Sequence, residues 1–446
     1  MDFENELISG VLIKRYKRFF VDIKMENKVI TAHCPNPGSM QKLLTKGNKV
    51  WITKSNNEKR KLSHTLQIIE VNNSVDGSQD ALLVRVTSGD HVGYGECEAS
   101  PLTSISAYVC PLSHGACRPV KDTVLGEIIE KPEDIHRLRN KLHLNSMDLL
   151  QAPHTFSGIE MALWDLMGKK YNEPVWSLLG YKDVFPKLAY FSVLFGDNPD
   201  ITYMRARDAK KLGFKAVKFG WGPIGKLNSK TDAEHFIAAR EGFGEENYVM
   251  VDVGQIFIDD VEKASERVDI LEKINATWLE EPFHAYEYDS FKNLKSKCKR
   301  LRIASGEGCH NTYMAKNLMK YGQIDFVQID CGRIGGIGPA KEIVDFAIKN
   351  NVTYVNHTFT SHLALSASMQ PFSGVEDFFI SEYPGNPMKL ATEITVNSID
   401  KDKNGYIKLP DGPGLGVDIN LSSLKKYLRN VEISIDSNTI FQSSEL

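Results

Sequence analysis

The sequence has no apolar run long enough to cross a membrane. Its most apolar stretches, such as residues 188–195 and 82–84, are far shorter than the roughly eighteen residues that a membrane-spanning helix requires. The first six residues are acidic and lack the basic start and apolar core of a secretory signal. These absences predict a protein without a membrane span, and we expect it in the cytoplasm.

The sequence also lacks paired cysteines. Its seven cysteines are an odd number, and none forms the C-x-x-C spacing that marks zinc or redox sites. We expect ordinary reduced thiols.

Charge of one sign does not dominate, but it is unevenly distributed. The 446 residues are 42% hydrophobic and 25% charged, which is typical of a globular protein with two or three domains. Residues 1–75 contain thirteen Lys/Arg against seven Asp/Glu, about +6, whereas the net charge of the whole chain is −3. The basic N-terminal part is therefore electrostatically distinct from the acidic remainder.

The N-terminal part has the pattern of a small β barrel. Short β-type runs alternate with turn residues at 35–38 and 46–48, and the polar stretch 72–78 is typical of a domain boundary. We place the first domain at residues 1–75, with strands predicted at 11–13, 19–23, 29–32, 50–53 and 66–71.

The remainder predicts an α+β domain followed by a closed barrel of alternating strands and helices. Residues 76–185 begin with a strand-turn-strand pattern at 81–96 and continue as helices, and we expect the segment 396–446 to return to this domain. Over residues 186–395 the strand-helix alternation predicts a TIM-type (β/α) barrel, so the fold class is α/β. Its predicted strands are 216–218, 248–251, 276–279, 302–304, 326–329, 352–355 and 378–380.

Ionisable residues stand at or just after the ends of these strands. Successive members are 34, 28, 27, 23, 27 and 25 residues apart, about one β-α unit each. In a β/α barrel the C-terminal strand ends meet at one rim, where catalytic groups lie. We therefore expect one site that contains Lys218, Asp252, Glu280, Glu307, Asp330, His357 and Glu382.

Three of these residues predict a metal site. Asp252, Glu280 and Glu307 follow neighbouring strands and offer only oxygen ligands, which suit a hard octahedral ion, above all Mg²⁺. Any one carboxylate alone is more often a solvated or capping group, but three at one-unit spacing favour a metal site.

Two further residues predict a general base. Asp330 and His357 would lie on adjacent strands, so that the carboxylate fixes the imidazole tautomer and leaves the other nitrogen free to take a proton. Lys218 would face this pair across the rim. His362 is a rival base five residues further on, and the spacing favours His357.

At these residues the chain resembles the enolase superfamily, over about residues 78–425. The motifs that carry the resemblance are Gly93-Tyr94-Gly95-Glu96, the run from Ser157 to Asp165, Trp278-Leu279-Glu280-Glu281-Pro282, and the run from Pro410 to Gly416. The resemblance implies a capping domain over a β/α barrel. It also implies that Asp252, Glu280 and Glu307 bind the metal, and that a metal-bound carboxylate substrate loses its α-proton to give a stabilised enolate.

The resemblance extends to the branch that contains mandelate racemase and the acid-sugar dehydratases. Asp330 and His357 match its Asp-His dyad, and Glu382 matches the glutamate that hydrogen-bonds the substrate carboxylate. That branch commonly has Lys-x-Lys after the second strand, but here Gly220 replaces the second lysine, which acts as a base on the opposite face. We therefore expect a hydro-lyase that dehydrates a sugar acid. An epimerase, racemase or cycloisomerase with the same enolate is the alternative.

Other positions are open to more than one interpretation. Gly254 stands where relatives often have asparagine, and Trp221 either shapes the pocket or packs structurally. His154 and His310 either contact substrate hydroxyls or are structural. Members of this family often assemble as dimers or octamers, so the resemblance also implies a homo-oligomer.

Residues 7–72 resemble the start of the sugar fermentation stimulation protein family, through residues 15–20, 32–40 and 60–62. This resemblance implies an OB-like barrel. A basic barrel with Tyr16, Phe19, Phe20 and Trp51 either binds nucleic acid or presents a solvated basic face. The competing class for the whole chain is thus a nucleic-acid-binding protein with a degenerate (β/α) barrel. No strand before Ala81 matches the usual first strand of the capping domain, so we expect that strand to be missing unless residues 65–71 supply it.

Overall fold

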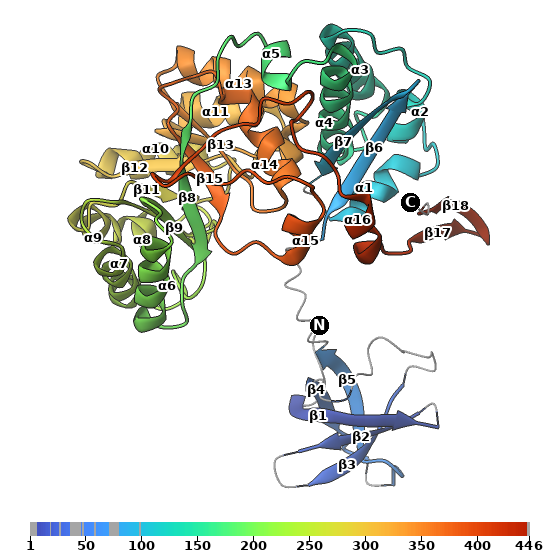
Figure 1. The fold of residues 1–446 in the computed structure, drawn as a ribbon. Helices are drawn as coiled ribbons and strands as arrows, with labels where there is room; N and C mark the ends of the chain where they lie inside the picture. The colour runs from blue at the N-terminus through green and yellow to red at the C-terminus, as the bar shows by residue number, and fades with distance from the viewer. Residues whose placement is uncertain are drawn as a thin grey trace. The chain divides into compact units, whose positions relative to one another are not determined.

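The computed structural model describes residues 7–17, 19–25, 28–35, 46, 49–57, 59–70, 80–97 and 100–443. The chain divides into two compact units, residues 1–79 and 80–446 (Figure 1). The linker predicted at 72–78, most of the turn at 35–38, Gly47 and Asn48 lie outside the described residues. No helix in the described ranges has both the length and the apolar character needed to span a membrane.

The first unit is the predicted small β barrel. Its strands follow the order β1-β2-β3-β5-β4 around a closed sheet. Alternate residues point inward, so Val21 and Ile23 of β2 are buried while their neighbours are partly exposed. The strands are β1 (Leu7–Tyr16), β2 (Phe20–Lys24), β3 (Val29–His33), β4 (Lys49–Lys54) and β5 (His64–Glu70).

The second unit begins with the capping domain. Its hairpin, β6 (Leu82–Ser88) and β7 (His91–Cys97), packs along α4 (Ala152–Tyr171), which in turn contacts α12 (Cys331–Ile334) and α13 (Ile337–Lys349) of the barrel (Figure 1). Two glycines allow this close packing, since a Cβ at Gly93 or Gly95 would lie about 2 Å from a carbonyl oxygen of α4. The other helices are α1 (Pro101–Val109), α2 (Val120–Val124), α3 (Pro132–Asn145) and α5 (Val175–Leu178).

The described part of the capping sheet, residues 80–97, has two strands. Of the segment 65–71 that was considered as a substitute first strand, residues 65–70 lie in β5 of the N-terminal barrel instead, paired with β4 and β3, and Val71 lies outside the described residues.

Eight parallel strands form the predicted TIM-type barrel, in the order β14-β13-β12-β11-β10-β9-β8-β15. Across the seam between β14 and β15, the Asn356 carboxamide oxygen accepts hydrogen bonds from Ser381 Oγ (2.8 Å) and the Glu382 amide (3.0 Å). The strands are β8 (Lys187–Leu194), β9 (Ala216–Gly220), β10 (Tyr248–Asp252), β11 (Trp278–Glu280), β12 (Arg302–Ser305), β13 (Phe326–Ile329), β14 (Thr353–Asn356) and β15 (Ile380–Pro384).

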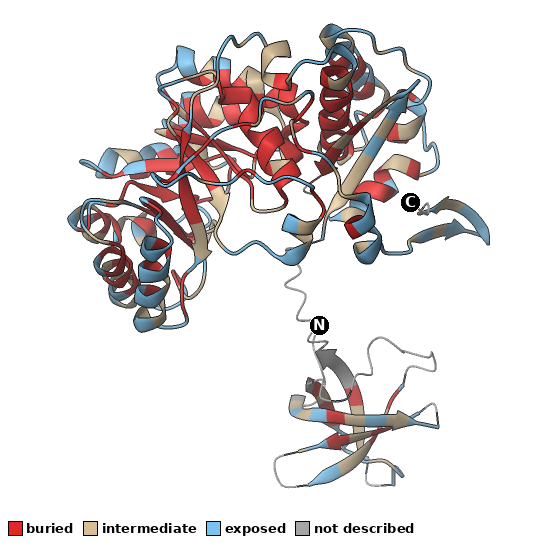
Figure 2. Cartoon of the chain, viewed as in Figure 1, coloured by how far each residue is buried: buried red, intermediate tan, exposed pale blue. Residues whose placement is uncertain are grey.

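The strands of this barrel are buried and its helices form the outer layer (Figure 2). The helices are α6 (Pro199–Lys211), α7 (Ser229–Phe243), α8 (Val261–Ser265), α9 (Val268–Lys273), α10 (Tyr288–Lys297), α11 (Thr312–Gly322), α12, α13, α14 (His362–Met369) and the 3-10 turn η2 (Gln370–Phe372).

Side-chain alternation decides what the rim presents. Ala216, Met250 and Trp278 belong to one buried apolar cluster contributed by the barrel strands. Because side chains two residues apart share a strand face, the residues two positions later point the same way, at the C-terminal end of β10 and β11 and two residues before the end of β9. These residues are Lys218, Asp252 and Glu280.

The C-terminal segment returns to the capping domain. The Asp165 carboxylate of α4 accepts a hydrogen bond from the Leu415 amide (2.9 Å), and Gly414 packs against Gly168. The remaining elements are α15 (Lys389–Glu393), β16 (Tyr406–Ile407), α16 (Leu421–Tyr427) and the exposed hairpin β17 (Glu432–Ile435) and β18 (Asn438–Gln442).

Candidate active site at the barrel rim

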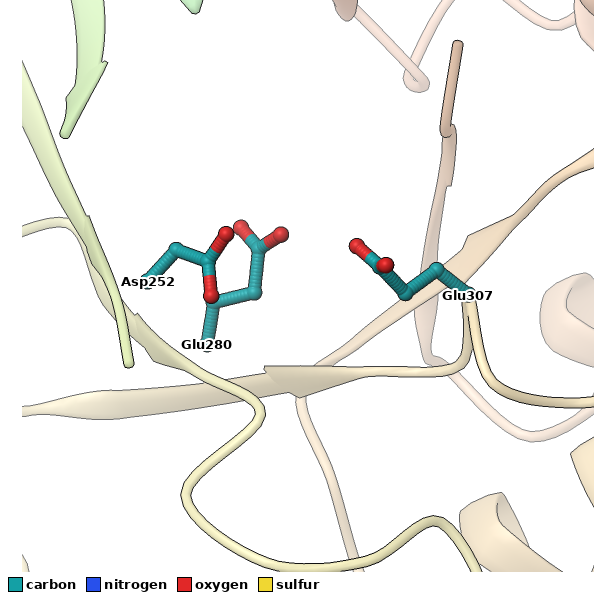
Figure 3. A group of neighbouring side chains, drawn as sticks. All are labelled: Asp252, Glu280 and Glu307. Atoms are coloured by element: carbon teal, nitrogen blue, oxygen red, sulfur yellow. The ribbon is translucent and has the colours of Figure 1, made fainter. Parts of the chain in front are cut away.

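The barrel brings three buried carboxylates to one place. Asp252 ends β10, Glu280 ends β11, and Glu307 follows β12 by two residues. Ligand oxygens from the three residues all lie within 4.8 Å of one another, and the carboxyl groups point into a common space (Figure 3). This arrangement of hard oxygen donors fits a divalent cation such as Mg²⁺.

The electrostatics of this triad also fit a cation. Burial, reinforced by the charge of Glu280, raises the pKa of Asp252 well above its usual range. Burial likewise raises the pKa of Glu280. Since carboxylates in one buried site disfavour each other's ionised form, a positive charge among them would stabilise all three.

Lys218 supplies one such charge from β9. Its ammonium donates to Glu280 Oε1 (2.6 Å) and Glu382 Oε1 (3.0 Å), and lies 3.9 Å from Asp252 Oδ2. Burial alone would lower the pKa of Lys218, but the two glutamates raise it well above the usual value. The lysine is therefore held as a cation beside the triad.

The Asp330-His357 pair has the geometry of an oriented imidazole. His357 Nδ1 donates to Asp330 Oδ2 at 2.7 Å, and the other oxygen of Asp330 accepts the Gly332 amide hydrogen at 2.6 Å. The aspartate thus fixes both the ring and its tautomer. His357 Nε2 faces the site, 3.2 Å from Glu307 Oε2 and 3.9 Å from Glu382 Oε2.

Glu307 links the triad to this histidine. Although burial opposes its ionisation, the positive charges of His357 and Arg333 lower the pKa of Glu307 to about 2. In return, Glu307 and Glu382 outweigh burial and raise the pKa of His357 to about 10.

Glu382 completes the set of predicted residues. It lies on β15, and its Oε2 accepts the Thr358 amide hydrogen at 2.8 Å while Oε1 accepts from Lys218. All seven predicted side chains are therefore buried in one connected network at the rim.

Two charged residues in this network had not been predicted. Arg333 Nη1 donates to Glu307 Oε1 at 3.0 Å. Glu281, next to a triad member, is buried, and burial raises its pKa well above the usual range. Glu281 directly follows Glu280, and Arg333 lies three residues after Asp330, but the direction of a side chain beyond a strand end was not readable from spacing.

The capping domain also approaches the rim. Glu96 of β7 is buried and accepts a hydrogen bond from Ser361 Oγ. His154, in the first turn of α4, has a buried Nε2 without a hydrogen-bond partner, and burial lowers the pKa of this imidazole to about 4. By contrast, the rival base His362 has its Nδ1 bonded to the Ile399 amide (3.1 Å) and its ring packed against Tyr383.

The two glycines noted in the sequence lie beside Asp252. A Cβ at Gly220 would be 3.1 Å from Asp252 Oδ2, and the Gly254 amide donates to Asp252 Oδ1 at 2.8 Å. Gly220 therefore adds no side chain beside the triad, and Lys218 is the side chain that β9 contributes there.

Comparison with known proteins agrees with this geometry. Residues 203–423 match the model described as "Enolase C-terminal domain-like", and residues 62–180 match the N-terminal domain of the mandelate racemase / muconate lactonizing enzyme family. The crystal structure titled "predicted Mandelate racemase" from Rhodobacter sphaeroides is 51% identical, covers 89% of this chain and 98% of its own, and superposes with a TM-score of 0.80. The chain belongs to the enolase superfamily.

Its curated relatives in the superfamily cover more than one reaction. An arabinonate dehydratase from Saccharolobus solfataricus is 27% identical over 348 residues, which are 76% of this chain and 88% of that protein. Two further relatives are a D-galactarolactone cycloisomerase from Agrobacterium fabrum and an N-succinyl-L-Arg/Lys racemase from Bacillus cereus, 26% and 25% identical over 287 and 339 residues.

The N-terminal barrel matches a different family. Residues 13–75 match the SfsA N-terminal OB domain. A sugar fermentation stimulation protein homologue from Pelagibacter ubique is 53% identical over 77 residues, but the chain covers only 33% of that protein's length. The OB-domain match and the capping-domain match overlap at residues 62–75, of which residues 64–70 form β5 of the barrel.

Proposed function

We propose that this enolase-superfamily chain is a Mg²⁺-dependent acid-sugar dehydratase. The observation that carries the proposal is the arrangement around the triad: an oriented imidazole, His357, stands on one side, and on the β9 side Gly220 offers no second base. A single base on one face of the substrate favours elimination, whereas racemisation needs a base on each face.

Asp252, Glu280 and Glu307 would hold the metal. When bound there, a divalent cation supplies positive charge against the negative charge that develops on the substrate carboxylate. Lys218 adds a fixed positive charge beside the same position, and Glu382, 3.0 Å from Lys218, would hydrogen-bond the substrate carboxylate.

His357 would carry the proton transfers. Asp330 accepts the Nδ1 proton, so Nε2 would remove the proton from the carbon next to the substrate carboxylate once a cation bound at the triad offsets the charge of Glu307 that raises the pKa of His357. The electron pair left on that carbon forms a double bond to the next carbon, whose hydroxyl leaves as water with a proton returned by His357 or another acid. The resulting enol converts to a 2-keto-3-deoxy acid.

Two residues are proposed to contact substrate hydroxyls. His154 offers an unpartnered Nε2 from the capping domain, and the exposed His310 lies three residues beyond Glu307.

The test is a product assay with a panel of aldonic and aldaric acids in the presence of Mg²⁺. We expect a 2-keto-3-deoxy product that EDTA abolishes and that His357→Asn reduces by at least about 1000-fold. His362→Asn is the matched control, since His362 contacts Ile399 and Tyr383 rather than the triad. Full activity in His357→Asn would refute the proposed base.

An epimerase, racemase or cycloisomerase is the alternative, because a cycloisomerase and a racemase are among the chain's sequence relatives. Proton NMR in D₂O distinguishes dehydration from these isomerisations. Deuterium incorporation at the α-carbon without loss of water would show that the chain catalyses one of these isomerisations rather than dehydration.

The N-terminal barrel supports a second, independent candidate function. Tyr16 and Phe19 are partly exposed, Phe19 stacks on His33, and Arg60 lies 3.4 Å from His33 Nδ1. Aromatic faces beside basic groups suit single-stranded nucleic acid. Fluorescence anisotropy with an oligonucleotide should show binding that weakens with salt and with Phe19→Ala, and the absence of binding at low salt would exclude this function.

A further inference from the structure

Trp221 is an exposed aromatic side chain at the rim of the barrel. It directly follows β9, three residues after Lys218, and its side chain is 57% exposed. The other four tryptophans, Trp51, Trp164, Trp176 and Trp278, are buried or half-buried. Its amide donates to the Asp252 carbonyl oxygen at 3.0 Å, so the residue is fixed to the strand end that carries a triad carboxylate.

The backbone of Trp221 is in an unfavourable conformation. Its φ is +56°, in the left-handed region that bulky residues avoid, and Gly222 follows with φ +64°. Such strain persists only where the surrounding structure imposes it, and it concentrates at functional sites.

Contacts on the far side of the turn hold this conformation. Gly222 packs so closely on Phe195 that a Cβ there would lie 2.9 Å from the Phe195 Cβ. The Gly225 amide donates to both carboxylate oxygens of Asp232 (3.1 and 3.2 Å), and Asp232 forms a buried ion pair with Arg267 (2.9 Å). The exposed indole is therefore presented by a rigid turn.

The indole lies over residue 254, two residues beyond the triad carboxylate Asp252. Its Cε2, Cδ2 and Nε1 atoms are 2.9–3.2 Å from the position that a Cβ at Gly254 would occupy, so the absence of a side chain at 254 makes room for the ring. The Gly254 amide itself bonds Asp252 Oδ1. Gly254 thus makes room for an exposed aromatic ring, and the same residue is bonded to a carboxylate that would hold the metal.

We propose that Trp221 is a stacking platform that selects sugar acids by the length of their carbon chain. Aromatic faces pack on the C–H faces of sugars, and this packing adds binding only when the chain extends beyond the reacting carbons. The platform would favour five- and six-carbon acids over a short α-hydroxy acid such as lactate. This inference rests on the proposed function for its substrate class.

The first readout is binding, measured as protection of tryptophan fluorescence from acrylamide in the full-length chain with Mg²⁺. D-gluconate, D-galactonate and D-arabinonate are the probes, and lactate is the short comparator. We expect at least one of the three acids to reduce quenching, lactate to have no effect, and Trp221→Phe to abolish the change. Trp176→Phe, the matched control, should retain it.

The second readout is kinetic. We expect Trp221→Ala to raise KM for the processed acid by at least about tenfold with a smaller effect on kcat, and Trp221→Phe to retain most of the affinity. Protection without any 2-keto-3-deoxy product would support the platform while refuting the dehydratase. No protection by any of the three acids, or product formation with an unchanged KM in Trp221→Ala, would overturn the platform.

Discussion

Replacement of Lys218 by methionine removes the positive charge that lies among the buried carboxylates. The ammonium is 2.6 Å from Glu280, 3.0 Å from Glu382 and 3.9 Å from Asp252, and all four side chains are at most 5% exposed. Removing one partner of a buried ion pair costs about 3–5 kcal/mol, because the other charge is left uncompensated. Since three carboxylates share this lysine, we expect a loss near the upper end, about 5 kcal/mol, in the absence of metal.

Added Mg²⁺ should reduce the stability that Lys218→Met loses relative to the wild type. A cation bound at the triad would compensate Asp252 and Glu280, two of the groups that Lys218 compensates. The variant should therefore bind Mg²⁺ more tightly than the wild type. Because a ligand at one hundred times its Kd stabilises the folded state by about 2.7 kcal/mol, tighter binding gives a larger stabilisation at the same Mg²⁺ concentration.

The assay is urea unfolding followed by tryptophan emission, in EDTA and over a series of Mg²⁺ concentrations. Lys215→Met is the matched control, since Lys215 is exposed and precedes the same strand, and it should behave like the wild type. Equal stabilisation of wild type and Lys218→Met by Mg²⁺ would refute a shared electrostatic site. So would a variant that is as stable as the wild type in EDTA.

Three further predictions concern the capping domain and the rim. Burial lowers the pKa of His154 from 6.5 to about 4. Between these pH values the unfolded chain binds the proton more readily than the folded chain, so the free energy of unfolding falls as the pH drops below about 6.5. The expected loss at pH 5 is about 2 kcal/mol, measured by urea unfolding. Glu160→Ala leaves three buried N–H donors without an acceptor, those of Ile337 (2.6 Å), Gly338 (2.8 Å) and the Trp164 indole (2.9 Å), and should cost about 3–5 kcal/mol in the same measurement. Gly254→Ala imposes a side chain at φ +53° and 2.9 Å from the indole of Trp221, so it should cost roughly 1–3 kcal/mol and shift the tryptophan emission.

Each of these predictions has a control or a contradicting result. His154→Gln should reduce the loss of unfolding free energy below pH 6.5, and an unchanged pH dependence would contradict the assignment to His154. Glu160→Gln keeps an acceptor and should lose less stability than Glu160→Ala. An emission spectrum unchanged in Gly254→Ala would mean that the ring does not lie over residue 254.

Much of the barrel and its site was predictable from the sequence, because the patterns involved are local. The ionisable residues from Lys218 to Glu382 recur at about one β-α unit, and parallel strands of such units place their C-terminal ends together. The predicted strand at 276–279 is β11, 278–280, two residues later at its start, since single-sequence patterns define element ends poorly. The family motifs, including Gly93 and Gly95, were likewise readable, and the structure gives their physical reason in the packing of β7 on α4.

Contacts between distant residues were decided only by the tertiary structure. Spacing placed Glu307 in the metal triad but could not show that it also faces His357 and Arg333, because a side chain beyond a strand end has no fixed direction in the sequence. His362 and His357 are five residues apart, and only the fold turns the first toward Ile399 and the second toward the rim. The position of the Trp221 indole over Gly254 depends on closure of the barrel and on a strained turn held by Phe195, which no local pattern encodes.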